Sequence, residues 1–299
     1  MLQDWIQAFR LRTLPLALAG IAMGSFLAAS MGKFSFLICG VSCLTAIFLQ
    51  VLSNLANDYG DTLHGADHDE RQGPARMVQA GKITPKAMQV AIALCALLAF
   101  GAGVGLLWIS LQTWQDFVVF LGLGLLSIVA AVTYTMGKKP YGYAGLGDLS
   151  VFIFFGAVAV SGVFYLYTTT WQWMVLLPAS SSGLLAVGVL NLNNIRDIES
   201  DQKAGKKSIP VRIGRSLAIT YHTLLLVAAL AATSLYVSFT WKSPWQLLFL
   251  ITLPLFFQNI RAVQQASSPA AVDPYLKHLA LSTLLFVLLF GIGQLISVQ

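Results

Sequence analysis

Long apolar segments alternate with short polar connections along the whole of this 299-residue chain. A helix of about 17 to 25 apolar residues crosses the roughly 30 Å hydrocarbon core of a bilayer, because each residue rises about 1.5 Å. Nine segments have this length, and they cover residues 14–31, 35–56, 87–109, 117–136, 149–167, 173–193, 217–240, 245–260 and 279–297. The pattern predicts an all-α polytopic membrane protein, with one transmembrane domain over residues 1–299.

The composition agrees with this interpretation. Apolar residues make up 57% of the chain and charged residues only 10%, against roughly 25% charged residues in a soluble domain. Mean hydropathy is +0.74. A lipid bilayer is therefore the expected environment, and no nucleic-acid partner is expected. The three cysteines lie in apolar segments without CxxC spacing, which favours a structural role.

The basic residues divide unequally between the two sets of alternate connections. Of the 18 lysines and arginines, only Lys33 and Lys242 fall in one set. The other 16 are Arg10, Arg12, Arg71, Arg76, Lys82, Lys86, Lys138, Lys139, Arg196, Lys203, Lys206, Lys207, Arg212, Arg215, Arg261 and Lys277. Basic residues concentrate on the cytoplasmic side of a membrane. We therefore expect a bacterial inner-membrane protein with a cytoplasmic amino terminus and the carboxyl terminus on the opposite side.

Two acidic clusters lie at matching places on the cytoplasmic side. The stretch N57-D-Y-G-D-T-L-H-G-A-D-H-D-E70 ends the second span, and N191-L-N-N-I-R-D-I-E-S-D-Q-K-A-G-K-K-S208 ends the sixth. The i, i+4, i+8 spacing of Asn193, Asp197 and Asp201 predicts one face of one helix. Because four spans separate the clusters, the sequence predicts two pseudo-repeated four-helix units and a ninth helix around a central cavity.

The clusters have the chemistry of a site for a metal ion and a polyanion. Carboxylate and amide oxygens suit Mg²⁺ or Mn²⁺, and Mg²⁺ shares phosphate oxygens with its substrate. Nearby basic residues would take the remaining charge of a diphosphate. A diphosphate at a membrane-embedded site indicates an isoprenoid. Helix caps and solvated helix ends are the alternative explanation, and a zinc pair at His64 and His68 is another, although no Cys or third His lies nearby.

The motifs N57-D-Y-G-D61 and N193-N-I-R-D-I-E-S-D201, with nine spans, resemble the UbiA-type intramembrane aromatic prenyltransferases. Three longer strings are similar to the menaquinone-pathway branch of that family, which acts on 1,4-dihydroxy-2-naphthoate. These strings are L49-Q-V-L-S-N-L-A-N-D-Y-G-D61, T133-Y-T-M-G-K-K-P-Y-G-Y-A-G-L-G-D148 and N191-L-N-N-I-R-D197. Where the general family pattern has an acid, this chain has Gly65, so Asp67 becomes the candidate ligand.

The resemblance implies transfer of a polyprenyl group, such as octaprenyl, from its diphosphate to the naphthoate, with loss of CO₂. It also implies two Mg²⁺ ions, with Mn²⁺ as a possible substitute. One ion would be held by Asn57, Asp58, Asp61 and Asp67, and the other by Asn193, Asp197 and Asp201. The residues expected to contact the diphosphate are Arg76, Lys138, Lys139 and Lys207.

Three further residues are candidates for the reacting centre. Tyr134 and Tyr141 are expected to line the aromatic or cation pocket, with a role as interfacial tyrosines as the alternative. Asp148 is expected to deprotonate or orient the acceptor, with a helix cap as the alternative. Two other functions remain open at this point, namely transfer to 4-hydroxybenzoate and cation-coupled transport.

Overall fold

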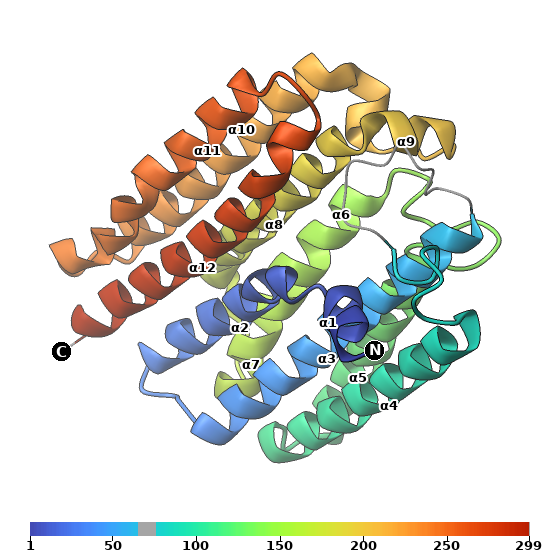
Figure 1. Cartoon of the computed structure of the whole chain (residues 1–299). Helices are drawn as coiled ribbons and strands as arrows, with labels where there is room; N and C mark the ends of the chain where they lie inside the picture. Colours follow the sequence, from blue (N-terminus) through green and yellow to red (C-terminus); the bar gives the residue numbers. More distant parts are fainter. Residues whose placement is uncertain (65–75, 299) are drawn as a thin grey trace.

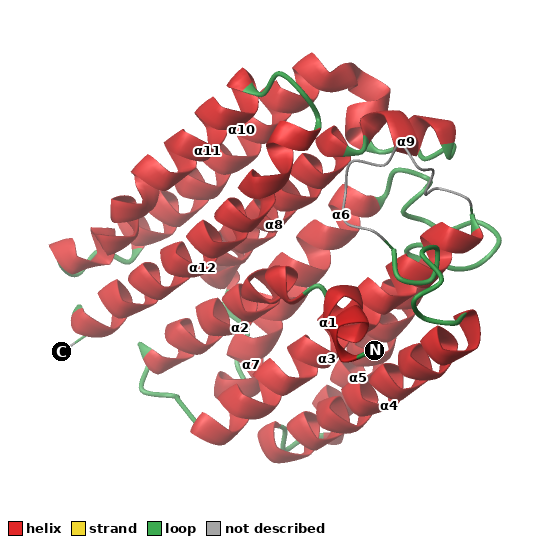
Figure 2. Ribbon diagram, in the orientation of Figure 1, coloured by secondary structure: helices red, strands yellow, loops and turns green. Residues whose placement is uncertain are grey.

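The structure is a computed structural model of the chain, and it describes residues 1–64 and 76–298. Within these residues every regular element is helical, and nine helical spans are long and apolar enough to cross a membrane. They form a single bundle (Figures 1 and 2). The expected all-α fold with nine transmembrane helices is confirmed.

The first span, Leu2–Ala29, begins with a short helix, α1, which ends at Phe9. Arg10 follows in a left-handed conformation (φ 48°, ψ 56°) and leads through η1 into α2. The elements of the first half are α1 (Leu2–Phe9), η1 (Leu11–Thr13), α2 (Leu14–Ala29), α3 (Phe36–Leu63), α4 (Pro85–Ser110) and α5 (Trp114–Thr133).

Polar caps mark where three of these helices begin. The hydroxyls of Ser35, Thr84 and Thr113 accept hydrogen bonds from backbone N–H groups three residues later. Such caps satisfy donors that a helix leaves unpaired, and each contributes about 1 kcal/mol.

The second half contains five spans, four of which are built from consecutive helical segments. Residues Phe152–Gly162 of η2 are π-helical, and α10, the helix of the remaining span, is interrupted at Gly214 (φ 80°). The elements are α6 (Gly147–Val151), η2 (Phe152–Gly162), α7 (Val163–Thr168), η3 (Trp173–Val175), α8 (Leu176–Arg196), α9 (Ile198–Lys203), α10 (Ile209–Phe239), η4 (Pro244–Thr252), α11 (Leu253–Gln265), η5 (Ala270–Val272) and α12 (Asp273–Ile296).

Three predicted boundaries differ from the observed ones for the same reason. Helix α3 continues to Leu63, past the predicted end at residue 56, α10 begins at Ile209 rather than at residue 217, and α12 begins at Asp273 rather than at residue 279. Hydropathy detects the part of a helix that lies in hydrocarbon, whereas the helix itself extends into the polar region beyond it. The first acidic motif therefore lies on the last turns of α3.

The second acidic motif is not on one continuous helix, so that prediction is wrong in detail. Helix α8 ends at Arg196, and Asp197 leaves the helical conformation (φ −98°, ψ 15°) before α9 begins. The N–H of Asp201 still donates to the carbonyl of Asp197 at 2.8 Å. The break is therefore local.

The two halves are packed to different degrees. The main buried cluster joins α2, α8, α10, η4, α11 and α12, and it includes Phe249, Phe256, Phe286 and Phe290. Helix α5, by contrast, has no buried residue. The loosely packed side of the bundle therefore leaves room for a cavity between α5 and the centre.

Polar side chains connect the helices of the packed half. His222 on α10 pairs with Asn259 on α11 at 2.9 Å, and the amide of Asn259 donates to the carbonyl of Tyr275 at 3.0 Å. Gln246 donates to Gln294 at 2.9 Å. Hydrogen bonds between membrane helices contribute about 0.6 kcal/mol each on average, so these contacts specify the packing of α10, α11 and α12 more than they stabilise it.

The ends of α3 and α8, which carry the two acidic motifs, lie at the same end of the bundle (Figure 1). Gly60 permits a close approach there, because a Cβ at this position would lie 2.6 Å from the carbonyl oxygen of Thr135. The carboxyl terminus lies at the other end of the bundle (Figure 1).

Candidate active site

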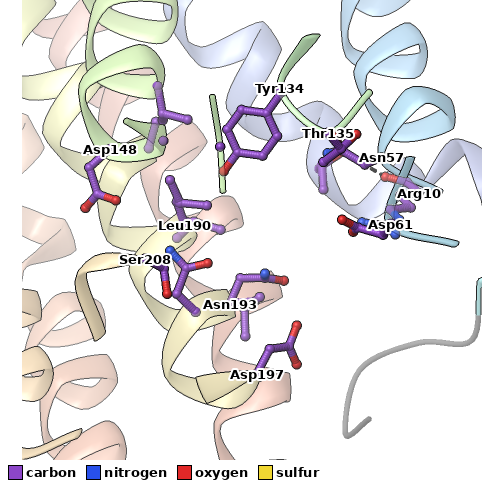
Figure 3. A pocket seen from close by; sticks show the side chains of 18 of the residues that line it. Arg10, Asn57, Asp61, Tyr134, Thr135, Asp148, Leu190, Asn193, Asp197 and Ser208 are labelled. Atoms are coloured by element: carbon purple, nitrogen blue, oxygen red, sulfur yellow. Dashed lines mark hydrogen bonds between the residues drawn. The ribbon is translucent and has the colours of Figure 1, made fainter. Parts of the chain in front are cut away.

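A polar cavity of about 190 Å³ lies where the ends of α3 and α8 face each other. Asn57 and Asp61 line it from α3, while Asn193, Asp197 and Asp201 line it from α8 and α9. Figure 3 shows Asn57 and Asp61 on one side of the space, and Asn193 and Asp197 on the other. Asp61 and Asp197 are 136 residues apart in the sequence. The two motifs that contain them nevertheless form one site, as predicted.

The carboxylate of Asp61 is buried and surrounded by donors. Its Oδ2 pairs with the guanidinium of Arg76, and its Oδ1 accepts a hydrogen bond of 2.9 Å from the hydroxyl of Tyr143. Arg76 and Asp61 are 4% and 2% exposed, so the pair is shielded from water. Arg76 thus lies beside the first motif, and its contact with a diphosphate stays a prediction.

Lys206 connects the two motifs. Its Nζ lies 3.2 Å from Oδ1 of Asp61 and 3.3 Å from Oδ1 of Asp201. Burial alone would lower the pKa of Lys206, but the charges of Asp61 and Asp201 outweigh this and raise it. Lys206 is therefore a cation that bridges the two halves of the site.

The pKa of Asp201 indicates crowding of negative charge. Burial raises this pKa, and the charges of Asp197 and Asp61 raise it further, while Lys206 opposes the shift. Neighbouring carboxylates raise one another's pKa when too few cations lie between them. Additional positive charge at this place would stabilise the ionised site.

Arg196 organises the second motif. Its Nε and Nη2 donate to Oδ1 and Oδ2 of Asp197 at 2.8 and 2.7 Å, and Nη2 also donates to Oδ1 of Asn193 at 2.8 Å. Its Nη1 pairs with Asp273 at the start of α12. The fork geometry of the guanidinium fixes the plane of the Asp197 carboxylate.

Tyr134 and Asp148 lie on the inner wall of the same cavity. Figure 3 shows the ring of Tyr134 between Asp148 and Asp61 in that view. The phenol lies against Gly147, where a Cβ would be only 2.7 Å from Oη. Burial, with the charge of Asp148 second, raises the pKa of Tyr134, so it remains protonated. The carboxylate of Asp148 accepts a hydrogen bond of 3.0 Å from Tyr221.

Tyr141 supports this wall rather than the polar cavity. Its ring packs edge-on against Tyr134 with centroids 5.4 Å apart, and its hydroxyl donates to the carbonyl of Ala130 at 2.9 Å. Its hydroxyl also lies 2.9 Å from that of Ser150. Tyr141 lines the larger chamber described next.

A much larger apolar chamber, of about 740 Å³, adjoins the polar cavity. It follows α5 from Asp116 to Ala131, a distance of roughly 20–25 Å along a helix. Residues that line both spaces are Gln50, Asn57, Tyr134, Val151, Phe155 and Leu190. The polar cavity and the apolar chamber can therefore hold the polar head and the apolar tail of a single substrate at the same time.

Several predicted residues do not reach the cavity. Asp58 points elsewhere, because its carboxylate accepts backbone hydrogen bonds from Met77 at 2.9 Å and Val78 at 3.1 Å. Through these contacts Asp58 holds the following loop against α3. This geometry does not support the prediction that Asp58 is a metal ligand. Asp67 lies outside the described residues, so its role as a ligand stays a prediction.

The cavity wall lacks the three lysines predicted to contact the diphosphate, because Lys138, Lys139 and Lys207 are exposed elsewhere. The wall contains Lys206, the neighbour of Lys207, instead. Adjacent lysines in a loop cannot be distinguished by charge pattern, because the pattern does not specify which side chain turns inward.

Four further residues line the cavity although the sequence pattern does not mark them as site residues. Arg10, Arg12 and Lys277 line the wall from the start of the chain and from α12, and the hydroxyl of Ser208 is buried there without a hydrogen-bond partner among residues 1–64 and 76–298. The available signal in the sequence was the excess of basic residues near the ends of the spans. Basic residues concentrate on the cytoplasmic side of a membrane in any case, so this excess does not identify the ones that line the cavity.

The residues fit a divalent cation that is shared with a phosphate group. The ammonium of Lys206 between Asp61 and Asp201 marks a position where a cation meets carboxylates of both motifs. In the described part of the chain, no group of three or more His, Cys, Asp or Glu side chains could hold a metal ion by itself. Mg²⁺ commonly uses one or two carboxylates and completes its shell with substrate phosphates and water, which is the donor set available here.

Comparisons with known proteins agree with this geometry. The chain is similar to a 1,4-dihydroxy-2-naphthoate octaprenyltransferase of Escherichia coli (strain K12), at 44% identity over 99% of this chain and 96% of that protein. Its fold is similar to that of a UbiA homolog from Aeropyrum pernix K1, with a TM-score of 0.69 at 16% identity, over 96% of this chain and 98% of that one.

A UbiA homolog from Archaeoglobus fulgidus, solved with DMAPP and Mg²⁺, is similar in fold, with a TM-score of 0.60 at 16% identity over 95% of this chain and 98% of that one. Residues 17–284 match the UbiA prenyltransferase family, a range that includes all nine spans at least in part and both acidic motifs. With this match, the full-length relative and the paired motifs at one cavity, the chain belongs to the UbiA prenyltransferase family.

Proposed function

We propose that the protein transfers a polyprenyl group from its diphosphate to 1,4-dihydroxy-2-naphthoate, with release of diphosphate and CO₂, to give demethylmenaquinol. The observation that carries this proposal is the junction of two unlike spaces at Asn57 and Tyr134. A cavity with carboxylates and cations opens there into an apolar chamber. The naphthoate as acceptor is supported by the printed activity of the 44% identical relative.

The diphosphate would lie among the cations of the polar cavity. Arg76 and Lys206 already lie beside Asp61, and Arg10, Arg12 and Lys277 line the remaining wall. Charge-assisted hydrogen bonds from such groups stabilise the negative charge that accumulates on the leaving diphosphate as the C–O bond breaks. The prenyl tail would extend along α5 into the apolar chamber.

Two Mg²⁺ ions would be held by oxygen atoms of the motifs. Asn57 and Asp61, with Asp67 as a further candidate, would hold one, and Asn193, Asp197 and Asp201 the other. When bound, each ion supplies Lewis-acid stabilisation of phosphate oxygens, and Mn²⁺ has the same preference for oxygen ligands. Asp58 is omitted from this set because of its backbone contacts.

Tyr134 and Asp148 would act on the reacting carbons. The face of the Tyr134 ring at the junction would stabilise an allylic cation. The acceptor carbon that carries the carboxylate forms the new C–C bond, and its bond to the carboxylate breaks as CO₂ leaves. Because CO₂ departs instead of a ring proton, no base is needed at that carbon, so Asp148 would orient a hydroxyl of the acceptor by accepting its hydrogen bond.

The proposed location is the inner membrane of a bacterium, with the polar cavity open to the cytoplasm. The distribution of basic residues supports this orientation, because 16 of the 18 lysines and arginines lie in the connections on that side. An odd number of spans then puts the carboxyl terminus on the opposite side.

The test is prenyl transfer by detergent-solubilised protein, with octaprenyl diphosphate and either 1,4-dihydroxy-2-naphthoate or 4-hydroxybenzoate, in Mg²⁺ or in chelator. Product from the naphthoate alone, and only with Mg²⁺, is expected. Product from the benzoate would retain the reaction type and contradict the acceptor. No product from either would contradict the proposed function and reopen cation-coupled transport.

A further inference from the structure

Asp273 is the first residue of α12, and it contacts the second acidic motif from outside that motif. One carboxylate oxygen pairs with Nη1 of Arg196, and the other lies 3.3 Å from Nη1 of Arg12. The contact thus joins the start of the chain, the end of α8 and the start of α12. In the sequence, Asp273 has no acidic neighbour that would have marked it as part of a site.

Arg196 transmits the position of Asp273 to two candidate metal ligands. Its side chain is 2% exposed, and its donors reach Asp197, Asn193 and Asp273 at the same time. A planar guanidinium held at one edge by Asp273 has little freedom to rotate at the other edge. The orientation of the Asp197 carboxylate and the Asn193 amide therefore depends on the contact with Asp273.

We propose that Asp273 is a positioning residue for the second acidic motif, which acts through Arg196 to orient Asn193 and Asp197. The inference rests on the proposed function, because it concerns the same Mg²⁺ site. Partners that orient metal ligands are typically worth about 10- to 100-fold in metal affinity.

The fold should tolerate the change that tests this role. The pair of Asp273 with Arg12, whose side chains are 33% and 29% exposed, contributes little to stability. The pair with buried Arg196 contributes more, so the substitution must leave Nη1 of Arg196 an acceptor. Asp273→Asn keeps the shape and one acceptor oxygen but removes the charge. Asp273→Glu keeps the charge on a longer side chain.

The experiment measures binding of Mn²⁺ to solubilised full-length protein with inorganic diphosphate present, by electron paramagnetic resonance of free Mn²⁺. It is paired with the Mg²⁺ dependence of prenyl transfer. Asp273→Asn is expected to weaken Mn²⁺ binding and raise the half-saturating Mg²⁺ concentration by about tenfold or more, with kcat at saturating Mg²⁺ changed far less. Asp273→Glu should restore most of the affinity. Asp4→Asn, whose carboxylate pairs with the terminal amine, serves as the control and should change neither.

Unchanged Mn²⁺ binding and Mg²⁺ dependence in Asp273→Asn would overturn the inference. So would a variant that only loses thermal stability while its folded fraction binds Mn²⁺ normally, because that is the behaviour of a structural contact. Failure of the unsubstituted protein to show Mg²⁺-dependent transfer would instead overturn the proposed function, so the two failures are distinguishable.

Discussion

The ammonium of Lys206 lies 3.2 Å from Oδ1 of Asp61, and this contact joins the second acidic motif to the first. The same ammonium lies 3.3 Å from Asp201 and 4.8 Å from the centre of the Tyr143 ring. One cation is thus held by a carboxylate from each motif and by an aromatic face. Its location makes it the lysine best placed to meet a diphosphate between the motifs.

Replacement of Lys206 by Met should therefore impair transfer strongly. A hydrogen bond to a charged group contributes about 1.5–3 kcal/mol, so we expect kcat/KM for the prenyl diphosphate to fall by at least about tenfold, since 1.4 kcal/mol corresponds to a factor of ten. The measurement is steady-state transfer at saturating Mg²⁺ with varied prenyl diphosphate.

Lys207→Met is the matched control, because Lys207 is the adjacent residue of the same loop and is exposed outside the cavity. Its kcat/KM should remain within about threefold of the unsubstituted value, as expected when a rim charge in high dielectric is lost. Equal losses in both variants would mean that the loop contributes by its overall charge rather than through Lys206.

The sequence was sufficient to predict those features that depend on long-range pattern. Apolar segment length predicted nine spans, and the paired clusters predicted one shared site, because parallel placement of two helices four spans apart brings their ends together. Asp61, Asn193, Asp197 and Asp201 consequently line the cavity as expected.

Features that depend on side-chain direction could not be predicted in the same way. Asp58 and Asp61 lie three residues apart on α3, yet one holds a loop and the other lines the cavity. Lys206 and Lys207 differ in the same manner. Adjacent loop residues such as Lys206 and Lys207 can point to opposite sides, whereas Asp58 and Asp61 share a helix face and differ only in their partners. Both choices depend on tertiary contacts, such as those of Tyr143 with Asp61 and with Lys207, whose N–H donates to the Tyr143 carbonyl at 2.9 Å.

The backbone contacts of Asp58 lead to a second prediction. In Asp58→Asn, the amide cannot accept both hydrogen bonds from Met77 and Val78, so a buried N–H loses its partner at a cost of about 1–3 kcal/mol. We expect a lower thermal unfolding midpoint in detergent. The Mg²⁺ concentration for half-maximal transfer should stay unchanged in the protein that remains folded.

Asp61→Asn provides the contrast, because Asp61 lines the cavity and pairs with Arg76 and Lys206. It should abolish transfer at every Mg²⁺ concentration while folded protein persists in the membrane. If Asp58→Asn instead shifted the Mg²⁺ dependence without lowering the unfolding midpoint, Asp58 would be a metal ligand after all.

A third prediction concerns the contact between Gly147 and Tyr134. In Gly147→Ala, the new Cβ would lie 2.7 Å from the hydroxyl oxygen and 3.4 Å from Cε2 of Tyr134. The ring must move, because over-packing of this kind costs about 1–3 kcal/mol. We expect kcat to fall by roughly tenfold, equivalent to about 1.4 kcal/mol of transition-state stabilisation, with a smaller change in KM for the prenyl diphosphate.

Gly105→Ala is its control, because a Cβ on this residue of α4 meets no atom within 4 Å and Gly105 lines neither space. Single-turnover rates distinguish a slower chemical step from slower product release. An unchanged single-turnover rate in Gly147→Ala would show that the position of Tyr134 does not matter for ionisation of the diphosphate.

The last prediction concerns the apolar chamber. It distinguishes binding of the prenyl tail from binding of the diphosphate head. Gly124 lines the chamber on α5, and a Cβ there meets no atom within 4 Å, so Gly124→Leu would project its side chain into the space that a tail occupies. Gly122 lies on the same helix with equal room around it but does not line the chamber. Gly122→Leu therefore controls for the change in helix propensity and in hydrophobic surface.

We expect Gly124→Leu to lower kcat/KM for octaprenyl diphosphate relative to geranyl diphosphate by about tenfold, the scale on which apolar pockets discriminate by size. Gly122→Leu should leave this ratio unchanged. Because the polar cavity is the same in both variants, a loss that is equal for the two substrate lengths would indicate distortion of the diphosphate site and would contradict the chamber as the place of the tail.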